Sequence, residues 1–126
     1  VPSDAVPVGG GKAVWLNDAA ATVPVMLGEV PSAASVVVPV NVGLTMIANP
    51  YPVGTPLSAL TAGGSGAGDL LYVWNGGGYD TYINYGIHGW FNTLTGVPSS
   101  AVELAVGQGA WLSSVAGGSI TFTKNF

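Results

Sequence analysis

Glycine and proline interrupt this chain so often that its apolar segments are short. Twenty of the 126 residues are glycine and nine are proline. Glycine favours turns, and proline removes a backbone donor and disrupts helix interiors. The segments between them are rich in valine, isoleucine, threonine and aromatic residues, which are typical of strands. The sequence therefore predicts an all-β protein.

The pattern predicts about nine or ten short strands and a single helical turn, which falls in "TPLSAL" at residues 55–60. The strands are expected at residues 12–17, 22–30, 35–42, 44–48, 70–74, 79–85, 89–94, 101–106, 109–115 and 119–126. Strands of this length with turn signals between them favour a β-sandwich, with a small closed barrel as the alternative. Pro24 and Pro39 lie within predicted strands, so these two strands are expected at sheet edges or bends.

The first eleven residues, "VPSDAVPVGGG", differ from the rest and predict an extended arm. Pro2 and Pro7 oppose helix, and the three glycines suggest a hinge. Residues 12–126 form one domain in this interpretation, which suits a chain of this length. A start at Val1 suggests that a leader has been removed, although no leader is visible in the sequence.

The clearest local signal is the β-hairpin predicted from "LLYVW", "NGGG" and "YDTYINY". A loop at residues 75–78, or at 76–77, places Trp74 opposite Tyr79 in both cases. Side chains alternate along a strand, so Tyr72 and Trp74 are expected on one face of the hairpin. Tyr79, Ile83 and Tyr85 share that face, whereas Leu71, Val73 and Tyr82 point the other way. Both faces of the hairpin are therefore apolar.

The amino-acid composition argues against several classes of function. Cysteine is absent, which excludes disulfides, thiolate metal sites and a cysteine nucleophile. Charged residues make up 6% of the chain, against about 25% in ordinary domains. Lys12 and Lys124 are the only basic residues, so nucleic acid is not expected as a partner. No segment has the roughly twenty apolar residues of a transmembrane helix. Weak charge leaves little electrostatic protection against association.

Catalytic signals are weak, and we expect no enzymatic activity, no metal and no cofactor. Asp69 and Asp80 are the only acids expected to approach each other, across the ends of the hairpin. His88 is the only histidine, and no G-x-S-x-G nucleophile motif accompanies it. The glycines of "GGSGAG" lack the Lys-Ser or Lys-Thr of a phosphate-binding loop.

Three motifs occur in a fixed order: "GLTMIANPYP" at Gly43, "YVWNGGGYDTY" at Tyr72 and "GQGAWLSS" at Gly107. Together they resemble a domain pattern of uncharacterised secreted and cell-surface proteins of bacteria, over about residues 12–126. The resemblance implies export and an all-β fold, and it implies no enzymatic activity. Physically, "NPYP" forms a rigid strand exit in which Tyr51 can close one end of the core. The glycines around Gln108 suggest a bulge or a close backbone contact before Trp111 packs.

Our leading functional hypothesis is a secreted structural subunit that assembles with itself into an extracellular filament or tubule. In this hypothesis the N-terminal arm adds a strand to the open sheet edge of a neighbour, in a head-to-tail contact that propagates. The expected localisation is extracellular or at the cell surface. The residues predicted at the assembly interface are Val6, Val8, Tyr82, Trp90, Phe91 and Phe126.

The alternative hypothesis is a carbohydrate-binding β-sandwich module with a surface glycan as its partner. Tryptophan and tyrosine offer flat apolar faces with a polar edge, which suits sugar rings. Asp80 and Asn84 are the expected hydrogen-bond partners in this hypothesis. The full predicted platform is Trp74, Tyr79, Tyr82, Trp90, Asp80 and Asn84.

Overall fold

The computed structural model describes residues 9–15, 30–60 and 66–126. The predicted strand at 22–30 lies outside these ranges, apart from Val30, and so do Val6 and Val8 of the arm. Residues 12–15 belong to no strand, so the strand predicted at 12–17 is wrong over its described part. In the described part of the chain, neither of two short helical turns approaches the length or hydrophobicity that a membrane-spanning helix needs.

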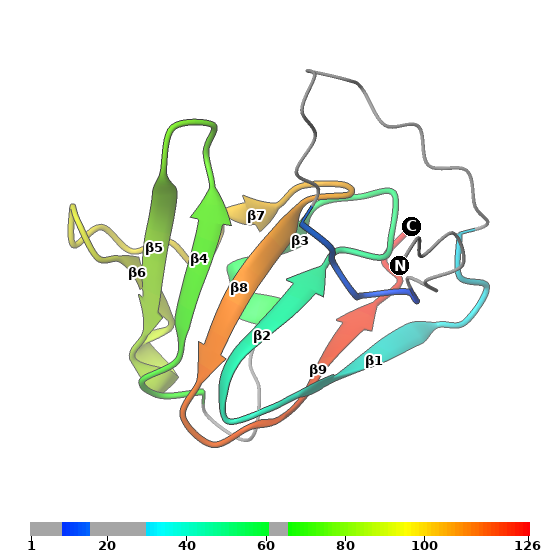
Figure 1. Cartoon of the computed structure of the whole chain (residues 1–126), viewed down its shortest axis with the longest axis horizontal. Coiled ribbons are helices and arrows are strands. Elements are labelled where there is room, and N and C mark those ends of the chain that lie inside the picture. Colours follow the sequence, from blue (N-terminus) through cyan, green and yellow to red (C-terminus); the bar gives the residue numbers. More distant parts are fainter. Residues whose placement is uncertain (1–8, 16–29, 61–65) are drawn as a thin grey trace, which may run out of the picture.

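The described residues form nine strands and two 3₁₀ turns (Figure 1). The strands are β1 (Ser35–Val40), β2 (Gly43–Ala48), β3 (Thr55–Pro56), β4 (Leu70–Trp74), β5 (Tyr79–Asn84), β6 (Trp90–Asn92), β7 (Glu103–Leu104), β8 (Gly109–Ser114) and β9 (Gly118–Thr123). The 3₁₀ turns are η1 (Leu57–Ala59), as predicted in "TPLSAL", and η2 (Gly86–His88). The all-β prediction is confirmed.

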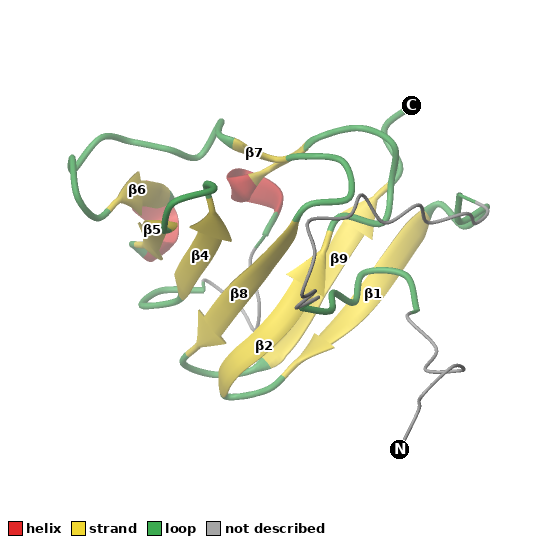
Figure 2. Ribbon diagram, turned by 45° about the horizontal axis from the view of Figure 1, so that its top comes forward, coloured by secondary structure: helices red, strands yellow, loops and turns green. Residues whose placement is uncertain are grey.

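Three antiparallel sheets organise these strands. The largest has the order β2-β8-β4-β5-β6, and β1-β9 and β3-β7 form two-stranded sheets. The β1–β2 and β8–β9 connections bring the β1–β9 ribbon round beside β2 and β8 (Figures 1 and 2). Within the described residues no sheet closes into a barrel, so the β-sandwich is confirmed over the barrel alternative. Pro39 lies on β1, whose only partner strand in this part of the chain is β9, as expected for an edge strand.

A single hydrophobic core joins the β1–β9 ribbon to the inner face of the five-stranded sheet. Alternation along each strand explains this arrangement, because every second side chain points inward. The burial pattern of β8 alternates strictly, and its inward residues Ala110, Leu112 and Ser114 are buried. The largest fully buried apolar side chains are Trp90, Tyr51, Phe122, Ile47, Leu57, Leu60, Leu71, Leu104, Leu112 and Ile120.

The β4–β5 hairpin forms as predicted. Trp74 pairs with Tyr79, and the loop between the strands is residues 75–78. Asn75 closes the loop: its backbone N–H donates to the Gly78 carbonyl at 3.0 Å. Gly76 has a φ of 98°, a left-handed conformation that glycine adopts without a Cβ penalty.

The corner after β2 is built around Asn49 and Tyr51. The Asn49 side-chain amide donates to the carbonyls of Val53 and Leu104, and its Oδ1 accepts the Tyr51 backbone N–H at 3.0 Å. Tyr51 is buried and its hydroxyl donates to the Ala33 carbonyl at 3.0 Å. Tyr51 therefore closes this end of the core, as the "NPYP" motif predicted.

The described end of the N-terminal arm packs against the sandwich. Gly11 is buried, and its carbonyl accepts the Ala48 backbone N–H at 2.9 Å. Its φ is 78°, and a Cβ at this position would overlap the Val38 side chain. The glycine run therefore provides a tight packing contact at Gly11, and the chain continues from there toward Trp15.

Candidate functional site

Register places a row of aromatic side chains on the outer face of the five-stranded sheet. Tyr72 on β4 pairs with Trp111 on β8, and Trp74 pairs with Tyr79 on β5. Directly paired residues of antiparallel strands point to the same face of the sheet. The inward neighbours on β4 and β5, Leu71 and Tyr82, are buried, so the paired aromatics point away from the core.

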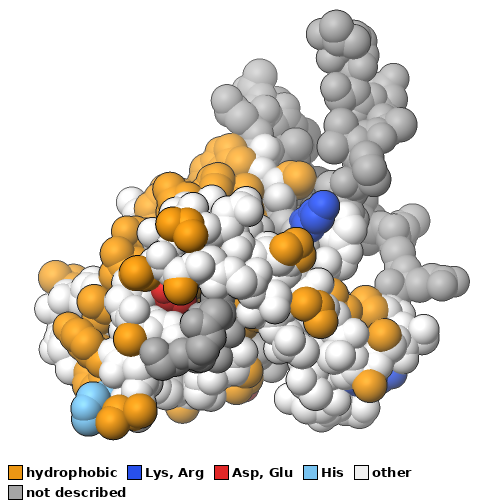
Figure 3. Space-filling view, turned by 90° about the horizontal axis from the view of Figure 1, so that it is seen from below, with side chains coloured by type: hydrophobic (Ala, Val, Ile, Leu, Met, Phe, Trp, Pro, Cys, Tyr) orange, Lys and Arg blue, Asp and Glu red, His pale blue; other side chains and the backbone are white. Residues whose placement is uncertain are grey.

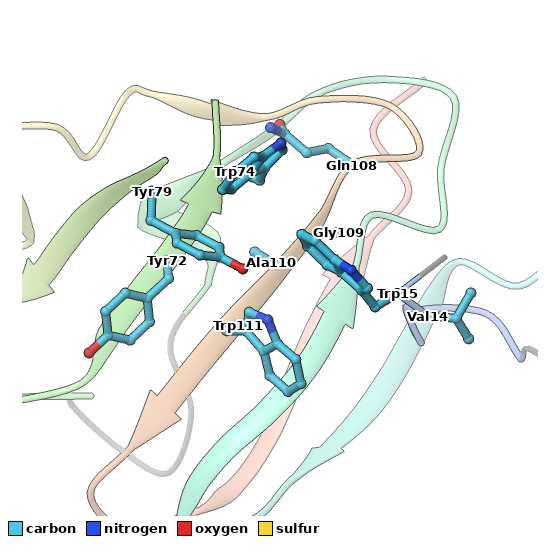
Figure 4. Close-up of a pocket in the computed structure, with 9 residues that line it drawn as sticks. All are labelled: Val14, Trp15, Tyr72, Trp74, Tyr79, Gln108, Gly109, Ala110 and Trp111. Carbon is cyan, nitrogen blue, oxygen red and sulfur yellow. The ribbon is translucent and has the colours of Figure 1, made fainter. Parts of the chain in front are cut away.

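A fifth ring comes from the N-terminal segment. Trp15 packs edge-to-face on Trp74, with ring centroids 5.9 Å apart and planes at 84°. The segment reaches this position by passing over Gly109, where a Cβ would lie 3.0 Å from the Cβ of Ala13. The predicted close contact at "GQGAW" is therefore found at Gly109. We call Trp15, Tyr72, Trp74, Tyr79 and Trp111 the aromatic face (Figure 4).

Four of these rings form a continuous edge-to-face chain. Trp74 and Tyr79 have centroids 5.2 Å apart, and Tyr79 and Tyr72 have centroids 6.4 Å apart. Edge-to-face contacts are favourable because the positive edge of one ring meets the negative face of the next. The contacts hold the rings in place and leave much of their surface open: Trp15, Trp74 and Tyr79 are 57%, 43% and 44% exposed.

The aromatic face surrounds a hollow of about 220 Å³. Its other lining residues are Val14, Gln108, Gly109 and Ala110, so no charged residue of the described ranges lines it. Gln108 lies beside Trp74 at the rim (Figure 4). Its Oε1 accepts the Ala105 backbone N–H at 2.9 Å, which fixes the orientation of the amide. The lining therefore combines ring surface with hydroxyl, indole N–H and amide groups.

The predicted sugar platform is divided between the two faces of the sheet. Trp74 and Tyr79 belong to the aromatic face. Tyr82 and Trp90 belong to the core at 7% and 0% exposure, and Asn84 is also buried. These three therefore take no part in the exposed surface, and the aromatic face contains Trp111 but not Trp90.

Asp80 lies at the loop end of the hairpin, opposite Val73, and its carboxylate accepts the Asn75 side-chain amide at 2.8 Å. Asp69 lies at the other end and is buried, accepting the Val115 backbone N–H at 2.8 Å and the Ser114 hydroxyl at 3.2 Å. The expected approach of Asp69 and Asp80 is wrong. Their register positions are four residues apart, which corresponds to about 13 Å along the strand.

The remaining predicted residues lie elsewhere. His88 is exposed in η2. Phe91 is half-buried on β6 and contacts Tyr85 with centroids 5.5 Å apart. Phe126 is exposed, packs against the Tyr51 ring at 5.8 Å and lies 4.9 Å from the Lys124 ammonium. In the ranges that the structure covers, no three histidine or acidic side chains come together as a metal site would require.

Three buried polar side-chain atoms lie on the inner side of the same hairpin. Asp69 Oδ2, Asn84 Nδ2 and Trp90 Nε1 are buried and have no hydrogen-bond partner within the described residues. Asn84 pairs with Trp90 in register, and its backbone N–H donates to the Asp69 carbonyl at 2.9 Å. These atoms have no exposure to solvent, so they belong to the interior and not to a site that a ligand reaches.

Sequence reasoning missed Trp15, Tyr72, Trp111 and Gln108 as members of one site. The signal for Tyr72 and Trp111 was present, because each is adjacent in its strand to a leucine, and adjacent side chains of a strand point to opposite faces. The two leucines, Leu71 and Leu112, are buried. Trp15 had no comparable signal, since its place depends on a contact with Trp74 far along the chain.

Comparisons of the chain with protein families, with curated proteins and with solved structures give no significant match.

Proposed function

We propose that this chain is a non-catalytic binding module whose aromatic face takes up a neutral carbohydrate. The observation that carries the proposal is the exposed chain of rings around a hollow in which no described lining residue is charged. Sugar rings present apolar C–H surfaces and hydroxyl groups. Tyrosine and tryptophan match both, because each has a broad apolar ring and a polar edge.

Charge supports a neutral ligand. Carboxylate, sulfate and phosphate groups are usually recognised by arginine or lysine. The hollow has neither, and the whole chain has a net charge of −4 with only two lysines. Uronic acids and sulfated sugars therefore have no ionic partner at the aromatic face.

The dimensions of the hollow support contact with a sugar chain lying across the sheet. Pockets that enclose drug-sized molecules have about 300–1,000 Å³. The hollow here is smaller, at about 220 Å³, and it is continuous with the exposed rings of Trp15 and Trp74. We propose that one ring of an oligosaccharide occupies the hollow while its neighbours lie over the flanking aromatic side chains.

Binding is tested by titrating the chain with neutral oligosaccharides and with uronic-acid oligosaccharides while tryptophan fluorescence is recorded. We expect saturable binding of a neutral sugar, weakened about tenfold in Trp111→Ala, which corresponds to roughly 1.4 kcal/mol. Leu44→Ala is the matched control, because Leu44 is 60% exposed on β2 and does not line the hollow. Equal weakening in both variants, or binding of acidic sugars alone, would contradict the proposal.

A second candidate function is the self-assembling structural subunit of an extracellular filament or tubule. Large apolar side chains outside the aromatic face support it, and orange hydrophobic side chains are scattered widely in Figure 3. Among the described residues the most exposed are Ile87, Leu94, Val42 and Val115. Chains with so few charges have little electrostatic resistance to association. Both candidates are compatible with the expected extracellular or cell-surface location, which we retain as a proposal.

Assembly is tested by sedimentation and negative-stain electron microscopy of the chain over a range of concentrations. We expect fibres or tubes that are weakened in the double variant Ile87→Ser, Leu94→Ser. Deleting residues 1–8 tests separately whether the arm joins neighbouring copies. A chain that stays monomeric at every concentration would exclude this function and leave carbohydrate binding unaffected.

A further inference from the structure

The loop of the β4–β5 hairpin contains a pair of residues with its own chemistry. Asn75 is the only asparagine in the sequence that is followed by glycine. A Cβ built on Gly76, Gly77 or Gly78 would meet no atom within 4 Å, so the loop extends into open space. We propose that Asn75 is a site of spontaneous deamidation in the folded protein, with water as the only co-reactant.

The reaction balances without an oxidant or a reductant. The backbone nitrogen of Gly76 attacks Cγ of Asn75 and loses its proton, and a five-membered succinimide forms. The bond from Cγ to Nδ2 breaks, and Nδ2 leaves as ammonia after it gains a proton. Water then opens the succinimide at either carbonyl. The product is aspartate, or isoaspartate in which the main chain runs through the side-chain carbon.

The hydrogen bonds around Asn75 favour the attack. Its Oδ1 accepts the backbone N–H groups of Gly77 at 3.1 Å and Gly78 at 2.9 Å. Negative charge develops on this oxygen when Cγ is attacked, and donors already aimed at such a position stabilise it. Nδ2 donates to the Asp80 carboxylate at 2.8 Å, which places an acid–base group beside the leaving amide.

Asn92 provides an internal control with the same hydrogen-bond pattern. Its Oδ1 accepts the backbone N–H groups of Leu94 at 2.9 Å and Thr95 at 3.0 Å, two and three residues along the chain. The next residue is Thr93, whose branched Cβ crowds the backbone nitrogen that must attack. The two asparagines therefore share the hydrogen bonds to Oδ1. They differ in the residue that follows and in a further side-chain partner, which is Asp80 for Asn75 and Tyr82 for Asn92.

Deamidation would change the edge of the aromatic face. The new carboxylate loses the hydrogen bond that the amide donates to Asp80 and stands beside a second negative charge. Like charges at neighbouring positions destabilise a hairpin. Isoaspartate also lengthens the main chain directly after Trp74, so the contact between Trp74 and Tyr79 is the one expected to loosen first.

The full chain is incubated at mildly alkaline pH and body temperature, and its peptides are then mapped by mass spectrometry and isoaspartate-specific methylation. We expect conversion at Asn75, with Asn92 slower by on the order of tenfold or more because of Thr93. Asn75→Ser should abolish the methylation signal from this peptide. Circular dichroism recorded throughout verifies that the chain stays folded.

Two results would overturn the proposal. One is equal conversion of Asn75 and Asn92, which would show that the glycine and the open loop have no effect. The other is an intact Asn75 in the folded chain while the same peptide converts in urea, which would show that the hydrogen bonds of the loop protect the amide instead of activating it.

Discussion

Trp74 and Tyr79 face each other directly across the β4–β5 hairpin, with ring centroids 5.2 Å apart and planes at 71°. Both rings also contact a further ring, Trp15 on one side and Tyr72 on the other. The pair therefore links the N-terminal segment to the central sheet. It also forms the wall of the hollow that lies nearest the hairpin loop.

Removing both rings of this pair should cost less than the sum of the single removals. Edge-to-face pairs contribute about 0.5–1.5 kcal/mol beyond their buried area. We expect a coupling free energy in this range from Trp74→Ala, Tyr79→Ala and the double variant, measured by urea unfolding. The same cycle with Trp74→Ala and Leu44→Ala should be additive. Additivity in both cycles would mean that the rings do not stabilise each other.

Asn49→Ala should destabilise the fold by about 2 kcal/mol or more. The substitution leaves the Tyr51 backbone N–H without its partner in a buried corner, and an unsatisfied buried group costs about 1–3 kcal/mol. It also removes the bonds that the amide donates to the Val53 and Leu104 carbonyls. Asn75→Ala is the matched control, because Asn75 makes its side-chain hydrogen bonds at an exposed loop, where water replaces them. Thermal unfolding of both variants compares the costs, and equal losses would contradict a structural role for the corner.

Gly11→Ala should destabilise the chain while Gly9→Ala does not. At Gly11 a Cβ would overlap the Val38 side chain, and a φ of 78° adds backbone strain of about 1 kcal/mol for alanine. At Gly9 a Cβ would meet nothing within 4 Å. Chemical unfolding measures the difference. Similar stabilities for the two variants would mean that the arm is not packed at Gly11.

Tyr82 should make stability depend on pH in the alkaline range. Burial, and then the nearby Asp80 carboxylate, raise the pKa of Tyr82 above its ordinary value, although a hydrogen bond with Asn92 opposes this. The folded state therefore holds the phenol proton at a pH where the unfolded state has lost it. The contribution is complete below the ordinary pKa of about 10 and is lost as pH rises through the folded pKa.

The measurement for Tyr82 is the free energy of unfolding between neutral pH and the alkaline limit, with absorbance to follow the phenolate. Tyr82→Phe should flatten the alkaline decline. Tyr79→Phe is the control, because Tyr79 is 44% exposed and lies on the other face of the sheet. An unchanged decline in Tyr82→Phe would show that another group controls the alkaline loss of stability.

Much of the central sheet was predictable because its rules are local. The "NGGG" loop fixes the hairpin register, and alternation then assigns Tyr72, Trp74 and Tyr79 to one face. Leu71 and Tyr82 are assigned to the other face by the same rule, and they are buried as that rule implies. The strands β1 and β8 likewise fall within the predicted apolar segments, and β2 and β9 begin one residue before theirs.

The local sequence did not determine which aromatic residues belong to the site. Trp90 and Trp111 both lie in short aromatic strands, yet one is fully buried and the other lines the hollow. The outcome depends on register: Trp90 pairs with Asn84 on the inner face, whereas Trp111 pairs with Tyr72 on the outer face. The pairing of Tyr72 with Trp111 joins strands that are distant in sequence, and no single segment encodes it.

By itself, the sequence determined an all-β chain, the central hairpin and the two faces of its strands, because side-chain alternation and turn chemistry act over a few residues. The tertiary structure decided which face became the core, since that depends on where the β1–β9 ribbon packs. It also brought Trp15 to Trp74, because long-range packing sets that distance.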